Sequence, residues 1–248
     1  MNIYEEKIRV RYAETGVNGL IKPVSAFNYF QDIMSRHCGR MNVSAYDLFT
    51  IGFAWVVIRY HIKIDRYPGW NDQITVRTWR CPLNDLYEMR QFEIYDEMAA
   101  LLMSAKSCWI VVNLASKRPA RLSRSLPENM ISGLQQPITD DMDAVSEIRR
   151  VDRERFFNIR MHDLDFNTHV NNSVYIVWAL ETVPENVITQ MRPEEIAIRY
   201  MGESLYGDRI KSEIEHARAH PKASFVHRLT SENTRKEVTR LKTVWRKF

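Results

Sequence analysis

The chain has 248 residues, a formal net charge of +4 and 45% hydrophobic residues, enough for a folded core and against disorder. The sequence contains no apolar run near the roughly 18 residues that cross a membrane. Its three cysteines, at 38, 81 and 108, match neither a disulfide framework nor a metal motif. The polar N-terminus does not resemble a signal peptide, so we expect a cytoplasmic protein with no membrane partner.

The charge pattern also limits the classes of binding partner that we expect. Positive and negative residues are interspersed, and the sequence shows neither a dense basic segment nor a nucleic-acid-binding module. We therefore expect no nucleic acid partner. A mild positive charge suits an acidic protein or a phosphate-bearing molecule better than a strongly basic one.

The first half of the chain predicts one helix on an antiparallel sheet. Residues 3–12 predict a strand, and Pro23 begins a helix whose apolar residues at 26, 27, 30, 33, 34 and 38 follow a 3.6-residue period. A short helical segment follows at 44–49. Alternating or apolar runs then predict strands at 55–64, 73–80, 87–96 and 105–113. This order is typical of an α+β domain.

The second half repeats the order of the first. The weakly patterned, polar residues 127–150 predict a linker between a domain at 1–126 and another at 151–248. After it come a predicted strand at 156–161, a polar loop and an apolar helix at 172–183. Further strands are predicted near 195–201, 207–216, 223–230 and 237–247.

An internal duplication explains this repetition. Aligning Arg11 with Arg160, a shift of 160 − 11 = 149, needs no gap through the helix, and further on Ile58–Tyr60 matches Ile198–Tyr200. The alignment fails at informative positions, because Gly16 stands opposite Asp165 and Leu20 opposite His169. We therefore expect the chemistry to reside in the second copy.

The polar loop between Asp163 and Asn172 contains the candidate catalytic side chains Asp165, Asn167 and His169. It leads into the apolar helix, where Asn171 or Asn172 is a natural N-cap, and N–H groups at that helix start are expected to polarise a substrate carbonyl. The alternative is that these residues only form a turn and a cap.

Metal binding fits this loop poorly. The spacing of Asp163, Asp165 and Asn167 begins like a calcium loop, but Thr168 and Val174 stand where that motif requires Gly and Glu. A zinc site would need partners for its histidines that the spacing does not supply. We expect neither a metal nor a cofactor.

A second polar point is Glu203, beside Gly202. It interrupts the predicted strand near 195–201, at a position that should be apolar or alternating. The alternative interpretation is an ordinary surface glutamate.

Several long motifs together resemble one family, the acyl-acyl carrier protein thioesterases of plant plastids and their bacterial relatives. The most specific is the decapeptide beginning at Asp163, followed by Tyr175 and Trp178-Ala179-Leu180-Glu181. The others lie in the first half: Trp55-Val56-Val57, Ile64–Asp72, Thr78-Trp79, Ser107–Asn113 and Lys117-Arg118-Pro119. The plastid targeting extension is absent from the sequence, so the chain is similar to the bacterial members.

The resemblance implies a tandem hotdog fold, each domain a long helix wrapped by an antiparallel sheet. It implies hydrolysis of the thioester between a fatty acyl chain and the phosphopantetheine arm of acyl carrier protein, which ends chain elongation in fatty acid biosynthesis. By motif, Asp165, Asn167 and His169 are catalytic, and the family's Glu-Cys pair falls on Glu203 and Ser204. Because no cysteine follows residue 108, we expect water as the nucleophile, with Glu203 as general base or, as the alternative, as direct nucleophile.

The first copy, which lacks the polar constellation, is expected to form the acyl-chain pocket, with Trp55 and Met34 among its lining residues. The rival functions are an acyl-coenzyme A thioesterase, a non-catalytic acyl-thioester-binding regulator and a dehydratase of hydroxyacyl thioesters. The sequence leaves open the preferred chain length and the choice between monomer and homodimer.

Overall fold

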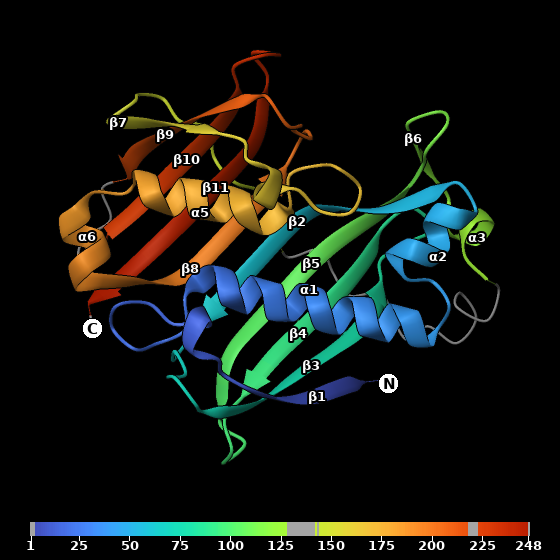
Figure 1. Ribbon diagram of the computed structural model, residues 1–248, viewed down its shortest axis with the longest axis horizontal. Coiled ribbons are helices and arrows are strands. Elements are labelled where there is room, and N and C mark those ends of the chain that lie inside the picture. Colours follow the sequence, from blue (N-terminus) through green and yellow to red (C-terminus); the bar gives the residue numbers. More distant parts are fainter. Residues whose placement is uncertain (1–2, 128–141, 143, 218–222, 248) are drawn as a thin grey trace. The chain divides into compact units, whose positions relative to one another are not determined.

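A computed structural model describes residues 3–127, 142, 144–217 and 223–247 (Figure 1). The chain forms two compact units, residues 1–142 and 143–248. Of the predicted linker, 127–150, residues 128–141 and 143 lie outside the described part of the chain. No helix among the described residues is long and apolar enough to cross a membrane.

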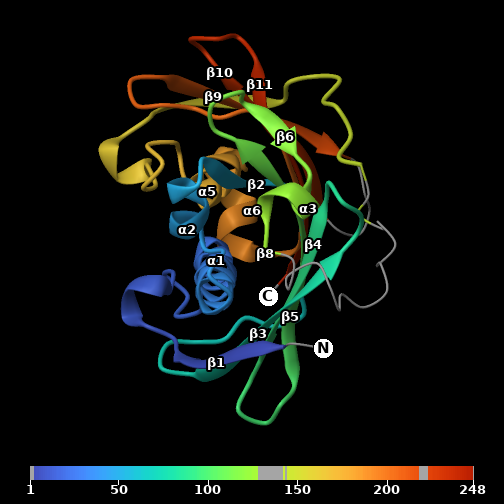
Figure 2. The ribbon, with the colours of Figure 1, turned by 90° about the vertical axis from the view of Figure 1, so that its right-hand side faces the viewer.

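Unit 1 is a long helix lying on an antiparallel sheet of order β1-β3-β4-β5-β2, with the short β6 beside β5 (Figures 1 and 2). Its elements are β1 (Tyr4–Arg9), η1 (Tyr12–Glu14), α1 (Pro23–Arg40), α2 (Ala45–Thr50), β2 (Phe53–Ile64), β3 (Gln73–Pro82), β4 (Glu88–Tyr95), β5 (Leu101–Asn113), β6 (Arg118–Ala120) and α3 (Leu122–Ser125). The predicted strands and both predicted helices are present, whereas β6, α3 and η1 were not predicted.

Helix α1 forms the centre of unit 1. The helix begins at Pro23, its first helical residue. Phe30 and Ile33, on the face that meets the sheet, are at most 1% exposed. The ring of Phe30 lies 5.0 Å from that of Phe92 on β4. Figure 2 shows the helix end-on within the curve of the sheet. The apolar period in the sequence therefore corresponds to this buried face.

Unit 2 repeats the arrangement, with sheet order β8-β11-β10-β9-β7 and helix α5 across it (Figure 1). Its elements are β7 (Arg153–Asn158), η2 (Met161–Asp163), α5 (Asn172–Thr182), α6 (Glu185–Gln190), β8 (Met191–Tyr200), β9 (Arg209–Ala217), β10 (Ala223–Ser231) and β11 (Glu237–Lys247). On α5, Tyr175, Ile176, Trp178 and Ala179 are buried, which explains why so few positions of this helix are polar.

The duplication is confirmed, but one part of its alignment was wrong. β2-β5-β4-β3-β1 and β8-β11-β10-β9-β7 are the same order of equivalent strands. In unit 1 the N–H groups of Asp65 and Arg66 both donate to Leu102 O, and in unit 2 those of Met201 and Gly202 both donate to Val238 O. That pairing fixes a shift of 201 − 65 = 136. The match of Ile58–Tyr60 with Ile198–Tyr200 is therefore four residues out of register.

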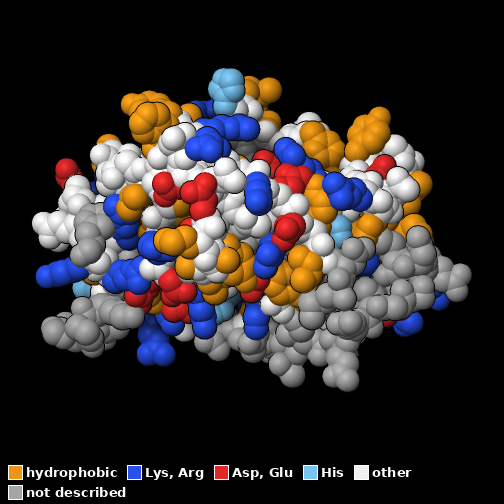
Figure 3. All heavy atoms as spheres, turned by 90° about the horizontal axis from the view of Figure 1, so that it is seen from below, with side chains coloured by type: hydrophobic (Ala, Val, Ile, Leu, Met, Phe, Trp, Pro, Cys, Tyr) orange, Lys and Arg blue, Asp and Glu red, His pale blue; other side chains and the backbone are white. Residues whose placement is uncertain are grey.

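Charged side chains of both signs are interspersed on the surface. On the face in Figure 3, Lys and Arg side chains alternate with Asp and Glu side chains. This agrees with the interspersed signs in the sequence.

The core of unit 2 contains a histidine whose protonation opposes folding. His227 is fully buried, its Nε2 lies 2.9 Å from Thr243 Oγ1, and burial lowers its pKa from 6.5 to about 3. Below pH 6.5 the unfolded chain binds a proton at this position that the folded chain does not. The stability that the neutral ring contributes is therefore lost as the pH falls from about 6.5 towards 3.

We expect the free energy of unfolding to drop by several kcal/mol, at about 1.4 kcal/mol per pH unit for this residue, between pH 6.5 and 4. In His227→Gln that slope should be smaller, whatever the variant's stability at pH 7. Urea unfolding at pH 7 and pH 4.5 measures it, with the exposed His162→Gln as control. Equal slopes in wild type and His227→Gln would contradict this account.

Candidate active site

The loop that carries the predicted catalytic residues is a hydrogen-bonded turn between β7 and α5. Asp165 N–H donates to His169 O (2.8 Å), Thr168 N–H donates to Asp165 O (3.0 Å), and Asn171 N–H donates to Asp163 O (2.9 Å). Asp163 is buried and bound to the Arg160 side chain. Although burial alone would raise the pKa of Asp163, these hydrogen bonds hold it below its usual value.

Unit 1 contains the same turn, but with Gly16 and Leu20 in place of Asp165 and His169. Gly16 N–H donates to Leu20 O (2.8 Å), and Lys22 N–H donates to Glu14 O (2.9 Å), each bond displaced by 149 residues from its counterpart. The left-handed position is Gly19 in unit 1 (φ 74°) and Thr168 in unit 2 (φ 63°). A β-branched residue is strained in this conformation, so Thr168 lowers the stability of unit 2 at a position where unit 1 has glycine.

His169 and Glu203 meet in unit 2. His169 Nε2 lies 3.3 Å from Glu203 Oε2, and the two side chains are 33% and 63% exposed. The segments are joined because Val170 N–H donates to Ser204 O (3.0 Å) and His169 pairs with Leu205 in an isolated bridge. The sequence placed these residues in separate motifs, and the structure brings them into contact at a site open to water.

Glu203 does not lie within a strand, contrary to our expectation. β8 ends at Tyr200, and Glu203 follows in the connection to β9. Gly202 beside it donates its N–H to Val238 O at 3.1 Å, but a Cβ there would meet Val238 Cγ1 at 3.4 Å, an ordinary contact, so this approach does not require glycine. The polar residue that interrupted the predicted alternation marks the end of the strand.

The Asp165 side chain is hydrogen-bonded to the backbone of Asn167. Asp165 Oδ1 accepts a hydrogen bond from Asn167 N–H at 2.8 Å, so the carboxylate fixes the turn that presents the Asn167 and His169 side chains. Both Asp165 and Asn167 are half-buried. Asp165 therefore acts on its own loop.

The start of α5 offers fewer free donors than the sequence suggested. Asn171 is the N-cap: its Oδ1 accepts from Ser173 N–H at 2.9 Å, and its carbonyl accepts from Val174 N–H at 2.9 Å. The N–H groups of Ser173 and Val174 are therefore already bonded and not available to a substrate carbonyl, and polarisation by the helix start stays a prediction. Tyr200, which the sequence did not single out as a support, donates from its hydroxyl to Asn172 O at 2.9 Å.

Ser204 points into the protein. It is 2% exposed, and its Oγ has no hydrogen-bond partner among the described residues. Tyr175, packed near it, is also buried, which raises the pKa of its phenol to about 12. A phenol that stays protonated at neutral pH cannot serve as the base that would activate the Ser204 hydroxyl.

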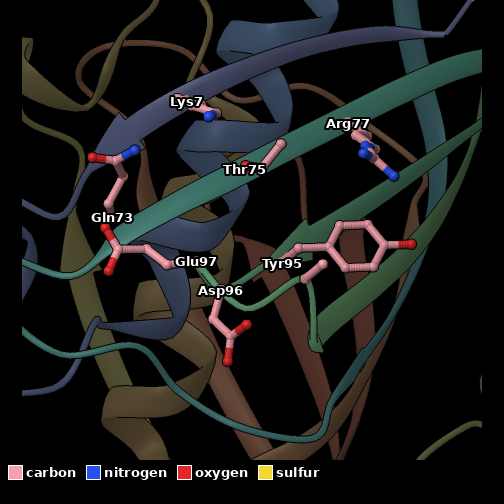
Figure 4. A pocket seen from close by; sticks show the side chains of 8 residues that line it. Lys7, Gln73, Thr75, Arg77, Tyr95, Asp96 and Glu97 are labelled. Carbon is pink, nitrogen blue, oxygen red and sulfur yellow. The ribbon is translucent and has the colours of Figure 1, made fainter.

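The predicted pocket residues lie in unit 1. Met34 is buried on α1, and half-buried Trp55 donates from Nε1 to Val43 O at 3.0 Å. An open depression of about 380 Å³ in this unit includes neither of them (Figure 4). It is lined mainly by polar and charged residues: Lys7, Gln73, Thr75, Arg77, Tyr95, Asp96, Glu97 and Ala99. Such a lining does not suit an acyl chain.

Within the described ranges, no group of three or more His, Cys, Asp or Glu side chains is arranged to hold a metal ion. The cysteines at 38, 81 and 108 are free and buried, and all three belong to unit 1. The polar side chains that meet in unit 2 are an acid, Glu203, and a histidine, His169, a pair suited to activating water, with Asn167 on the same loop as His169.

Comparisons with known proteins place both units in one family. Residues 1–130 match the acyl-ACP thioesterase N-terminal domain, and residues 146–247 match the acyl-ACP thioesterase C-terminal domain. The chloroplastic oleoyl-acyl carrier protein thioesterase of Coriandrum sativum is 27% identical over 98% of this chain and 77% of its own length.

Two solved structures share the fold. An acyl-ACP thioesterase from Bacteroides thetaiotaomicron superposes with a TM-score of 0.86 at 19% identity, over 98% of each chain. The 12:0-ACP thioesterase from Umbellularia californica gives 0.85 at 20% identity, over 99% of this chain and 98% of its own. The fold is therefore the tandem hotdog that the sequence predicted.

The two domain matches follow one another in the family's order and together span nearly the whole chain. The chain accordingly belongs to the acyl-ACP thioesterases, the enzymes that hydrolyse fatty acyl-acyl carrier protein and release the fatty acid.

Proposed function

We propose that this enzyme cleaves its thioester by direct attack of water, with Glu203 as the general base. The support is the contact between His169 Nε2 and Glu203 Oε2 at 3.3 Å, on a carboxylate that is 63% exposed and thus accessible to water. Glu203 takes a proton from the attacking water, and His169 holds the carboxylate in place. The leaving thiol, with an ordinary pKa of roughly 8.5, departs largely as thiolate, so the step needs no strong acid.

The developing oxyanion needs a donor, and we assign it to the Asn167 side-chain amide. The backbone N–H groups of Asp165, Asn167, Thr168, Val170 and Asn171 all have partners within the protein. A side-chain donor is therefore the better candidate, and preorganised donors of this kind supply a large part of such catalysis. Asp165 is a positioning residue in this scheme, because it acts through the turn that it closes.

Ser204 is not the nucleophile in this proposal, because its hydroxyl is buried and lacks a base. We expect Ser204→Ala to retain kcat within about threefold of wild type, since a truncated hydroxyl without a partner removes no reacting group. Steady-state hydrolysis of an acyl-acyl carrier protein measures this. A loss of about 10³-fold or more with an unchanged melting temperature would restore the serine as nucleophile.

The acyl chain, we propose, is received by unit 1, with Met34 and Trp55 among the lining residues. Met34→Ala enlarges the space beside α1, so we expect the preferred acyl chain to become longer. Competition among acyl-acyl carrier proteins of different chain lengths measures this preference. The matched control is Val183→Ala, the position in unit 2 displaced by 149 residues. An unchanged preference in Met34→Ala would rule Met34 out as a determinant of chain length.

We further propose that the reaction ends chain elongation in fatty acid biosynthesis in the cytoplasm, with the enzyme as a monomer or homodimer. Three free, buried cysteines suit a reducing compartment. Expression in a fatty-acid-producing host tests the first point, since free fatty acids should accumulate only with the active enzyme. Cell fractionation tests the compartment, and sedimentation tests the oligomeric state.

A further inference from the structure

Exposed apolar side chains flank the His169–Glu203 pair. Met161 and Phe166 on the loop before α5 are 63% and 60% exposed, and Leu205 and Tyr206 after Glu203 are 50% and 63% exposed. We call these four residues the rim. Its two segments are held together by the Val170–Ser204 hydrogen bond and the His169–Leu205 bridge. Large apolar groups gathered around a reacting site indicate a surface that a partner covers.

Two arginines beside the rim are exposed, whereas two aspartates near them are buried. The Arg160 side chain is 72% exposed, whereas its partner Asp163 is 3% exposed. Asp208 is 7% exposed and accepts hydrogen bonds from two backbone N–H groups, while the adjacent Arg209 is exposed, with its guanidinium over the Phe156 ring at 4.2 Å. Asp163 and Asp208 thus turn inward while Arg160 and Arg209 are exposed, although Glu203 and Glu232 are exposed acids beside them. Such a surface complements an acidic protein.

The duplication supplies a comparison surface. At the positions equivalent to Met161, Phe166 and Tyr206, unit 1 exposes Tyr12 (79%), Val17 (109%) and Trp70 (62%). Two features are missing there: Gln73 stands in place of Arg209, and Tyr67 stands in place of Glu203. Unit 1 thus presents an apolar loop of the same geometry without the catalytic pair or this arginine.

We propose that the rim and Arg209 form the surface on which the carrier protein docks to deliver its acyl thioester. This inference rests on the proposed function. The His169–Glu203 pair lies at the protein surface, so a folded carrier that inserts its prosthetic arm there must itself lie against the rim. An acyl-coenzyme A molecule has no protein body to make that contact. The rim therefore distinguishes the two carriers while leaving the chemical step unchanged.

The test compares Tyr206→Ala with Trp70→Ala, its counterpart in unit 1, on the same acyl chain carried by acyl carrier protein or by coenzyme A. We expect Tyr206→Ala to raise KM for the carrier-protein substrate about tenfold, as for a central interface aromatic, with kcat and the coenzyme A kinetics within about twofold of wild type. Trp70→Ala should change neither. Arg209→Gln, which copies Gln73, should raise the same KM less and weaken its dependence on salt.

Unchanged KM values in Tyr206→Ala would overturn the docking surface but leave the proposed function intact. Equal losses with both carriers, or equal effects of Tyr206→Ala and Trp70→Ala, would also overturn it, because they indicate a structural role. A wild-type dimer that Tyr206→Ala dissociates in sedimentation, with KM unchanged, would make the rim a contact between copies. Failure of the wild type to cleave any acyl-acyl carrier protein would instead refute the proposed function itself.

Discussion

Glu203→Gln is expected to lower kcat by about 10² to 10⁴ fold while leaving the melting temperature unchanged. The amide retains the size of the side chain but cannot accept the proton from the attacking water. Because the residue is 63% exposed and outside the strands, its replacement leaves no buried group unpaired. Steady-state hydrolysis of an acyl-acyl carrier protein, with thermal unfolding alongside, measures both quantities.

The matched control is Glu185→Gln, another exposed glutamate of unit 2, at the start of α6. It should retain wild-type kcat. If Glu203→Gln retained it too, Glu203 would be neither base nor nucleophile, and its contact with His169 would be a surface ion pair of little energetic consequence.

Asn167→Ala is expected to lower kcat by about 10² to 10³ fold, the range for the loss of one oxyanion donor. The N–H groups of Asp165, Asn167 and Thr168 should not rescue the loss, because they are already bonded within the loop. Asn167→Asp should be at least as damaging, since it replaces a donor with a negative charge at the same position. The measurement is kcat with a saturating acyl-acyl carrier protein.

Asn18→Ala provides the control, because Asn18 is the equivalent residue of unit 1. There the side chain only closes a turn, accepting from Leu20 N–H at 3.0 Å. A variant Asn167→Ala that lost no more activity than Asn18→Ala would show that Asn167 is also only a turn residue, which is the alternative that the sequence left open.

Local patterns were enough to predict most of the fold. The apolar period after Pro23 and the apolar run after Asn172 correspond to α1 and α5, because a helix that covers a sheet must present its apolar residues at that spacing. The ungapped shift of 149 residues was also reliable. It spans a turn whose hydrogen bonds recur one by one in the two units, so an insertion there would break them.

The failures occurred where the answer depends on contacts between distant segments. Strand identities around Tyr60 and Tyr200 misled the alignment by four residues, since alternating apolar positions resemble one another at every even shift. The sequence predicted free N–H groups at the start of α5, but the N–H groups of Ser173 and Val174 donate to the side chain and the carbonyl of Asn171. The meeting of His169 with Glu203 depends on the Val170–Ser204 hydrogen bond, which no local pattern reveals.

The site residues also divide into those that local motifs identified and those whose role depends on the folded structure. Motif resemblance selected Asp165, Asn167, His169 and Glu203, and the structure brings the last two into contact. It leaves the roles of Trp55 and Met34 as predictions, because the shape of an acyl pocket depends on how side chains rearrange around the chain. Ser204 was ambiguous in the sequence, where only its neighbours were visible. Its burial argues against a role as nucleophile, since a nucleophile must be reachable.

The central claim is that water, and no side chain, attacks the thioester. The most direct test is a rapid-quench experiment with enzyme in excess over acyl-acyl carrier protein, following free thiol and free fatty acid together through the first turnover. We predict that the two products appear with a single common rate and that no acyl group is found on the enzyme. A burst of thiol ahead of fatty acid, with an acyl adduct on Glu203 or Ser204, would contradict the account.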